Sequence, residues 1–189
     1  MMAKRLLPLL FLPLLLSCED ASDKLFPQPR PVQLPAETRV GANTFGCHVN
    51  GEVWEANNIS TLAGKVLTPH AYYKNGELRV DAFRRLQVDG PITNVFFTVG
   101  QVTGPGVYEL AEKGSSAKLT TANGLIDYSV NSPHAGTLTI TRLDTTGAHP
   151  GIAGRFSLRA VARPGTSRPA DFPAELTITD GRFDIQLRH

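Results

Sequence analysis

The chain has 189 residues, and its 19 lysines and arginines nearly balance 17 aspartates and glutamates, which gives a formal net charge of +2 at pH 7. Proteins that bind nucleic acid through phosphate contacts carry a clear excess of basic residues, so this composition gives no reason to expect a nucleic-acid partner. The length fits one domain once the N-terminal region is set aside.

Residues 1–17 have the layout of a secretory signal. Lys4 and Arg5 form a positively charged start, and an apolar run from Leu6 to Leu16 follows. This run is shorter than the roughly 20 apolar residues of a membrane-spanning helix and contains two prolines, so the sequence predicts export and not a membrane span. Removal of the signal leaves 17 basic and 17 acidic residues in a formally neutral mature chain.

The signal ends in Leu15-Leu16-Ser17-Cys18, which resembles a bacterial lipobox. The resemblance implies that the Cys18 thiol is modified with diacylglycerol and becomes the new N-terminus. Two or three acyl chains would hold the protein on a bilayer, since each buried CH₂ contributes about 0.8 kcal/mol. The alternative is an ordinary signal followed by a chance cysteine. The acidic residues 19–23 resemble the surface-export signal of Bacteroidota-type lipoproteins, which implies an outer-membrane location facing outward.

Residues 18–40 follow as the lipidated N-terminus and a disordered tether. They contain four prolines and show no periodicity. Residues 41–189 then form the single predicted domain, which the tether lifts away from the lipid headgroups.

The domain shows the alternation and turn residues of an all-β protein. Asn50-Gly51 and Asn75-Gly76 predict hairpins, because both residues of each pair tolerate positive φ. Gly181 interrupts the last apolar run and predicts a bulge or a tight turn. About ten short strands between such turns predict an antiparallel β-sandwich or a partly open barrel, and the pattern leaves both open.

The segment 41–54, GANTFGCHVNGEVW, is similar to the opening of an uncharacterised lipoprotein domain family of Bacteroidota. The similarity returns at residues 136–144, at 154–156 and in the TDGRFDI segment, residues 179–185. This resemblance implies the fold and the cellular location only. The family provides no activity and no catalytic residue to carry over.

No motif in the chain predicts catalysis, a metal site or a cofactor. Cys47 lies in an apolar strand-like run, and the adjacent His48 would point to the opposite face, so we expect a buried, unreactive thiol. The five histidines lack zinc-site spacing, the aspartates form no dense calcium loop, and there is no nucleophile elbow or phosphate-binding loop. A site assembled from distant strands stays open.

Two groups of residues are candidates for ligand binding. Trp54, Tyr72 and Tyr73 would form a sugar-stacking platform if exposed, although a tryptophan at the end of a hairpin arm is more often part of the core. Arg155, Arg159 and Arg163 share one face of a strand. Such arginines usually mark a solvated face, but they would form an anion-binding stripe if they align across paired strands.

The sequence therefore predicts an outer-membrane lipoprotein, anchored through Cys18, that acts as a non-catalytic binding or accessory module for a glycan or an envelope protein. A lipocalin-like carrier, which would need a closed barrel with an apolar lumen, is the first alternative. A hydrolase with a site built from distant strands is the second, and a structural role in an envelope complex stays open.

Overall fold

The computed structural model describes residues 32–56, 69–86, 90–111, 115–121, 126–130, 135–164, 170 and 172–188. The predicted signal, the lipidation site Cys18 and the first part of the predicted tether lie outside these residues. Within them the chain forms eleven strands and no helix. No stretch of the described residues is therefore a helix long and apolar enough to cross a membrane.

The strands form one antiparallel sheet, which confirms the predicted all-β fold. Its order is β2-β1-β11-β10-β8-β7-β5-β4-β3, and β9 pairs with β10 while β6 pairs with β9. The strands are β1 (Thr44–Val49), β2 (Glu52–Glu55), β3 (His70–Lys74), β4 (Glu77–Arg84), β5 (Thr93–Val99), β6 (Gly106–Glu109), β7 (Ser116–Thr121), β8 (Ile126–Ser129), β9 (Gly136–Asp144), β10 (Gly151–Ala162) and β11 (Glu175–Gln186).

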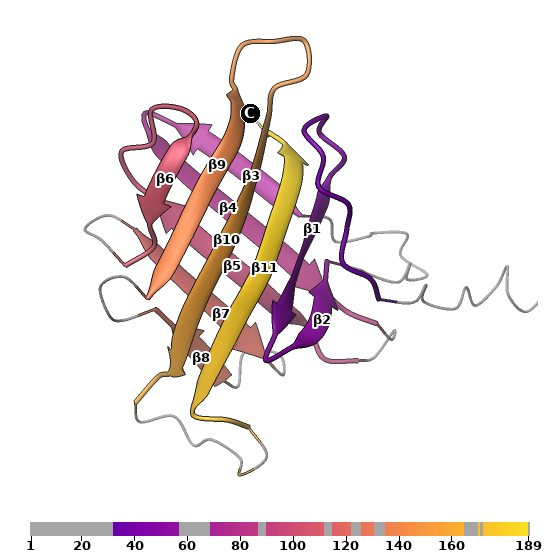
Figure 1. Ribbon diagram of the computed structural model, residues 1–189, viewed down its shortest axis with the longest axis vertical. Coiled ribbons are helices and arrows are strands. Elements are labelled where there is room, and N and C mark those ends of the chain that lie inside the picture. The colour runs from indigo at the N-terminus through magenta and orange to yellow at the C-terminus, as the bar shows by residue number, and fades with distance from the viewer. Residues whose placement is uncertain are drawn as a thin grey trace, which may run out of the picture.

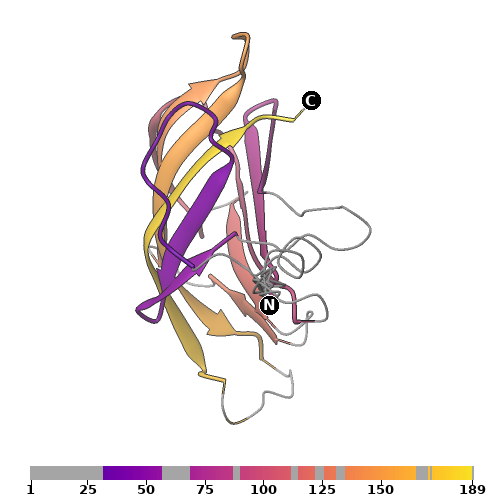
Figure 2. The same ribbon diagram turned by 90° about the vertical axis from the view of Figure 1, so that its right-hand side faces the viewer.

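The sheet curls into two facing layers. Figure 1 shows β6, β9, β10, β11, β1 and β2 in front of β3, β4, β5, β7 and β8, and Figure 2 shows the two layers from the side. The long strand β10 joins them, because it pairs with β9 from Gly151 to Leu158 and with β8 through Val161 and Ala162. A bridge between Ala71 and Leu187 brings β3 against the end of β11. The fold thus combines sandwich-like layers with a partly open barrel.

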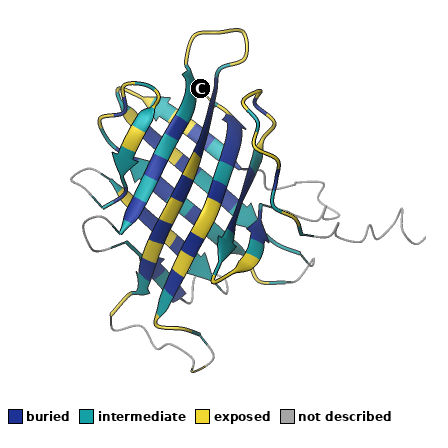
Figure 3. Cartoon of the chain, in the orientation of Figure 1, coloured by how far each residue is buried: buried dark blue, intermediate teal, exposed yellow. Residues whose placement is uncertain are grey.

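The core fills the space between the layers. Buried and exposed residues alternate along β10 and β11 (Figure 3), as expected for strands with one face inward. Phe45, Phe156 and Phe183 of the front layer meet Phe97 of the back layer, and the centroids of these four rings lie 5.0–6.4 Å apart. We call these four residues the phenylalanine cluster. It holds the two layers together by buried aromatic packing.

The predicted turns and bulge are confirmed. Asn50-Gly51 joins β1 to β2 and Asn75-Gly76 joins β3 to β4, and all four residues have positive φ. In β11 the pairing with both neighbours shifts by one residue around Asp180, which also has positive φ. A Cβ on the next residue, Gly181, would lie 2.5 Å from the Phe156 carbonyl oxygen, so this bulge position requires glycine.

Candidate functional site

The segment before β1 lies on the outer face of the front layer. We call residues 33–42 the strap; it is the indigo segment leading into β1 in Figure 1. Its Pro35 is buried against Gly46, where a Cβ would come within 2.4 Å of the proline ring, and the Gln33 amide donates to Glu55. The predicted disordered tether, residues 18–40, is therefore wrong for residues 32–40, because these contacts hold them on the domain. The rest of that range lies outside the described residues.

A buried carboxylate, Asp184 of β11, fixes the end of the strap. It is 1% exposed and accepts hydrogen bonds from the Thr38 hydroxyl and from the amides of Val40, Gly41 and Ala42, at 2.7–3.1 Å. Burial alone would raise the pKa of Asp184, but these bonds, beginning with the one from Thr38, bring it below its ordinary value. The charged carboxylate is thus the native form.

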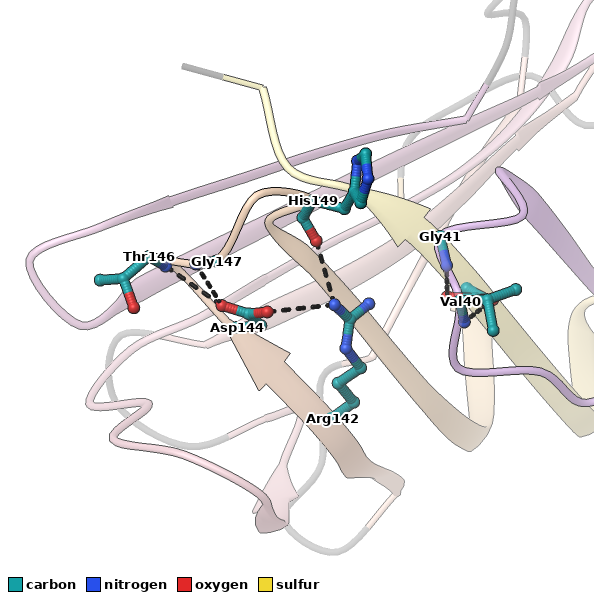
Figure 4. A network of polar contacts seen from close by, with 8 residues as sticks. Val40, Gly41, Arg142, Asp144, Thr146, Gly147 and His149 are labelled. Atoms are coloured by element: carbon teal, nitrogen blue, oxygen red, sulfur yellow. Dashed lines mark hydrogen bonds and ion pairs between the residues drawn. The ribbon is translucent and has the colours of Figure 1, made fainter.

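A second carboxylate lies at the same end of the front layer. Asp144 accepts from the amides of Gly147 and Thr146 in the turn after β9 and pairs with Arg142, which also donates to the His149 carbonyl (Figure 4). The Gly147 and Thr146 bonds lower the pKa of Asp144. Asp144 thus binds the backbone of its own turn. The backbone hydrogen-bond donors to Asp144 come from its own turn, so this carboxylate stabilises the turn.

The middle of the strap places an acidic side chain over β10. Both oxygens of Glu37 accept hydrogen bonds from Arg155, each at 2.8 Å, in the two-point geometry typical of arginine and carboxylate. These bonds from Arg155 hold the pKa of Glu37 below its ordinary value. Arg155 is therefore the predicted stripe residue that the fold brings into contact with the strap.

A second arginine stands directly beside the first. Arg182 of β11 is the cross-strand partner of Arg155. Among the described residues it donates only to the carbonyl oxygens of Asp180 and Pro35, both at 3.4 Å. Among the described residues no carboxylate lies within ion-pair distance of it. Arg182 is thus a weakly satisfied cation next to an arginine that is already paired.

These side chains surround a hollow of about 320 Å³ on the outer face of β9, β10 and β11, which we call the strap hollow. It is lined by Glu37, Thr137, Thr139, Arg155, Phe156, Ser157, Asp180, Gly181 and Arg182. The Oδ2 atom of Asp180 lies 3.1 Å from Nδ1 of His48, within ion-pair distance. Within the described part of the chain, the hydroxyls of Thr137, Thr139 and Ser157 have no hydrogen-bond partner, so they can bond to a ligand. Each of the three strands contributes polar side chains to the lining of the hollow.

The other predicted arginines lie away from the strap hollow. Arg159 pairs with Glu175 of β11, and both side chains are exposed. Arg163 follows the end of β10 and is exposed. The structure thus brings Arg155 next to Arg182 but does not bring Arg155, Arg159 and Arg163 together as one uncompensated stripe.

The predicted aromatic platform is not brought together. Trp54 is 5% exposed, packs edge-on against Phe45, and its Nε1 donates to the Thr93 hydroxyl. Tyr73 packs against the core and donates to the Val102 carbonyl. Only Tyr72, 41% exposed on the outer face of β3, has the exposure that sugar stacking requires.

Cys47 lies in the core, as its sequence position predicts. It is 0% exposed, and burial raises the pKa of its thiol to about 12. The neighbouring His48 points outward to Asp180 and cannot act as its base. Within the part of the chain that the structure describes, no three histidine, cysteine or acidic side chains are grouped to hold a metal ion.

Comparisons with known proteins were made by family models, by curated sequences and by solved structures, and none of the three found a match to this chain.

Sequence reasoning missed Glu37 and the three hydroxyl residues of the strap hollow. Glu37 was assigned to a tether, and 118 positions separate it from Arg155. The threonines of β9 looked like ordinary outward-facing strand residues. The available signal was the arginine alternation in β10, which pointed to this face of the sheet without identifying its partner.

Proposed function

We propose that this protein is a lipid-anchored, non-catalytic binding module of the outer membrane, and that the strap hollow is its binding site. The observation that carries the proposal is that two adjacent arginines line one exposed hollow together with three hydroxyls that have no hydrogen-bond partner among the described residues. The hollow's volume of about 320 Å³ lies at the lower end of the range for small-ligand sites. The anchor rests on Cys18 and on the resemblance to lipoprotein signals.

The arrangement of the core favours surface binding over a lipocalin-like carrier. A carrier needs an apolar lumen, whereas the phenylalanine cluster occupies the space between the two layers. A ligand on the outer face of the front layer needs no such lumen.

The hydrolase alternative has weaker support in the strap hollow. It contains two carboxylates, Glu37 and Asp180, but a general acid needs a raised pKa, and the hydrogen bonds from Arg155 lower that of Glu37. The site is built to hold charge and hydroxyl groups in place, which is the chemistry of binding.

The anchor is tested by Cys18→Ala. Without a thiol at this position no acyl chain can be attached, so we expect the variant to be recovered as unprocessed precursor or in the soluble fraction, with membrane retention essentially lost. Membrane fractionation with detergent phase separation measures this, and Cys47→Ala serves as the matched cysteine control. Unchanged retention of the Cys18→Ala protein would contradict the anchor.

The binding site is tested by filling the strap hollow. Ser157 is exposed on β10, so Ser157→Trp should leave the sheet intact while blocking the hollow, and we expect retention of polysaccharide extracted from the host envelope to fall at least about tenfold. Thr177→Trp is the control, because Thr177 is exposed on the same layer but does not line the hollow. Equal loss with both variants, or none with either, would contradict the assignment.

A further inference from the structure

We propose that the strap hollow takes a saccharide bearing an anionic oxygen group, and that Glu37 occupies the place of this group in the free protein. The inference rests on the binding function proposed above and specifies its ligand.

The strap hollow holds two arginines and two carboxylates, Glu37 and Asp180. Among the described residues Glu37 pairs with Arg155 and Asp180 pairs with His48, which leaves Arg182 without an ion pair. Because Arg155 and Arg182 are direct cross-strand partners, their like charges lie side by side on the same face of the sheet. The Glu37 carboxylate bonds to Arg155 through both oxygens, while Arg182 has only two 3.4 Å bonds to carbonyl oxygens. A planar anion in the hollow would gain charge-assisted hydrogen bonds from both guanidinium groups.

Glu37 is placed so that its carboxylate can leave without release of the strap. Pro35 on one side is buried against Gly46, and Thr38 on the other side is bound to Asp184. The Glu37–Arg155 pair itself is exposed, and exposed ion pairs contribute little to stability. An incoming carboxylate or phosphate can therefore replace Glu37 at Arg155 while the strap stays on the domain.

The remaining lining specifies a saccharide in preference to an apolar anion. Thr137, Thr139 and Ser157 provide hydroxyls that both donate and accept, and Asp180 provides a further acceptor. Phe156 and Gly181 are the only apolar residues of the lining. Such a surface matches the hydroxyl groups of a sugar ring and offers little to a fatty acid.

The test is calorimetric titration of the full chain in detergent with D-glucuronate, D-glucose 6-phosphate and D-glucose. We expect both anionic sugars to bind and the neutral sugar to bind at least about tenfold more weakly, since it lacks the charge-assisted bonds. The ratio between the two anionic sugars shows whether a carboxylate or a phosphate is preferred. Removal of the internal competitor in Glu37→Gln should tighten binding about threefold.

Variants of Arg182 separate the effect of its positive charge from the effect of its two-point donor geometry. Arg182→Gln should weaken binding of D-glucuronate about tenfold, and Arg182→Lys should restore only part of it, because lysine keeps the charge but lacks the two-point donor geometry. Glu175→Gln is the matched control: it breaks the Arg159 pair on the same two strands, outside the hollow, and should change nothing.

Two results would overturn the inference. One is equal binding of D-glucose and D-glucuronate; the other is binding that is unchanged in both Glu37→Gln and Arg182→Gln. Either result would leave the binding function intact if Ser157→Trp still abolishes retention of envelope polysaccharide, so the two proposals fail separately.

Discussion

Asp184→Ala is expected to lower the free energy of unfolding by about 3–4 kcal/mol. The substitution removes four hydrogen bonds to a charged, buried acceptor, and such bonds contribute more than neutral ones, although the freed strap can regain water. Asp184→Asn should lower the free energy of unfolding less, by about 1–2 kcal/mol. The side-chain oxygen of the asparagine can still accept hydrogen bonds from Thr38, Val40 and Ala42. Urea unfolding of the purified protein measures both.

The lowered pKa of Asp184 predicts how the free energy of unfolding depends on pH. Because the folded-state pKa of Asp184 is lowered, its contribution is fully present above the unfolded-state value of about 4 and is lost as the pH falls through the folded-state pKa. The difference between wild type and Asp184→Ala should therefore shrink on acidification.

Asp144→Asn is the matched control for Asp184. The Asp144 carboxylate also accepts backbone hydrogen bonds, but it lies in an exposed turn. Asp144→Asn should therefore lower the free energy of unfolding clearly less than Asp184→Ala does. Equal stability of Asp184→Ala and wild type near neutral pH would contradict the role of Asp184 as the fixing point of the strap. Faster cleavage by trypsin at Arg39 is the accompanying sign of strap release in the variant.

Phe45→Ala should lower the free energy of unfolding by about 3–5 kcal/mol, at least as much as Asp184→Ala. Phe45 contacts the other three rings of the phenylalanine cluster and also Trp54, so the truncation leaves a cavity between the two layers. Phe45→Leu should lose less than about 1.5 kcal/mol, since most of the volume is kept. Chemical denaturation again provides the measurement.

Phe96→Ala controls for the loss of an aromatic ring as such. Phe96 lies next to Phe97 in β5 but faces outward, where Arg79 covers its ring at 4.9 Å from the centroid. Its removal should cost about 1 kcal/mol or less. A loss for Phe45→Ala no larger than that for Phe96→Ala would contradict the cluster as the link between the layers.

The fold could be predicted from local sequence because its strands and turns have local causes. Asn-Gly pairs define two hairpins by their tolerance of positive φ, and the alternation through Phe156 and Leu158 separates the buried from the exposed face of β10. The layer arrangement could not be read in this way. It depends on β10 pairing with β9 and with β8 along different parts of its length, and alternation alone is the same in a sandwich and in a barrel.

The candidate site was predicted only in part, because it combines residues from distant segments. The face carrying Arg155 was recognised, and its alignment with Arg182 is the condition under which an anion-binding stripe was expected. Glu37 could not be assigned, because a proline-rich segment without periodicity gives no sign that it folds onto the sheet. Asp184 could not be assigned for a related reason, because its hydrogen-bond donors come from the strap, which is distant in sequence.

Arginine Nε–Hε NMR signals of the full chain, recorded while D-glucuronate is added, would report directly on the strap hollow. We predict that the signals of Arg155 and Arg182 move and saturate together, while those of Arg159 and Arg79, which lie outside the hollow, stay in place. Unchanged Arg155 and Arg182 signals at concentrations where binding is detected would contradict the site, because the ligand would then be held elsewhere on the molecule.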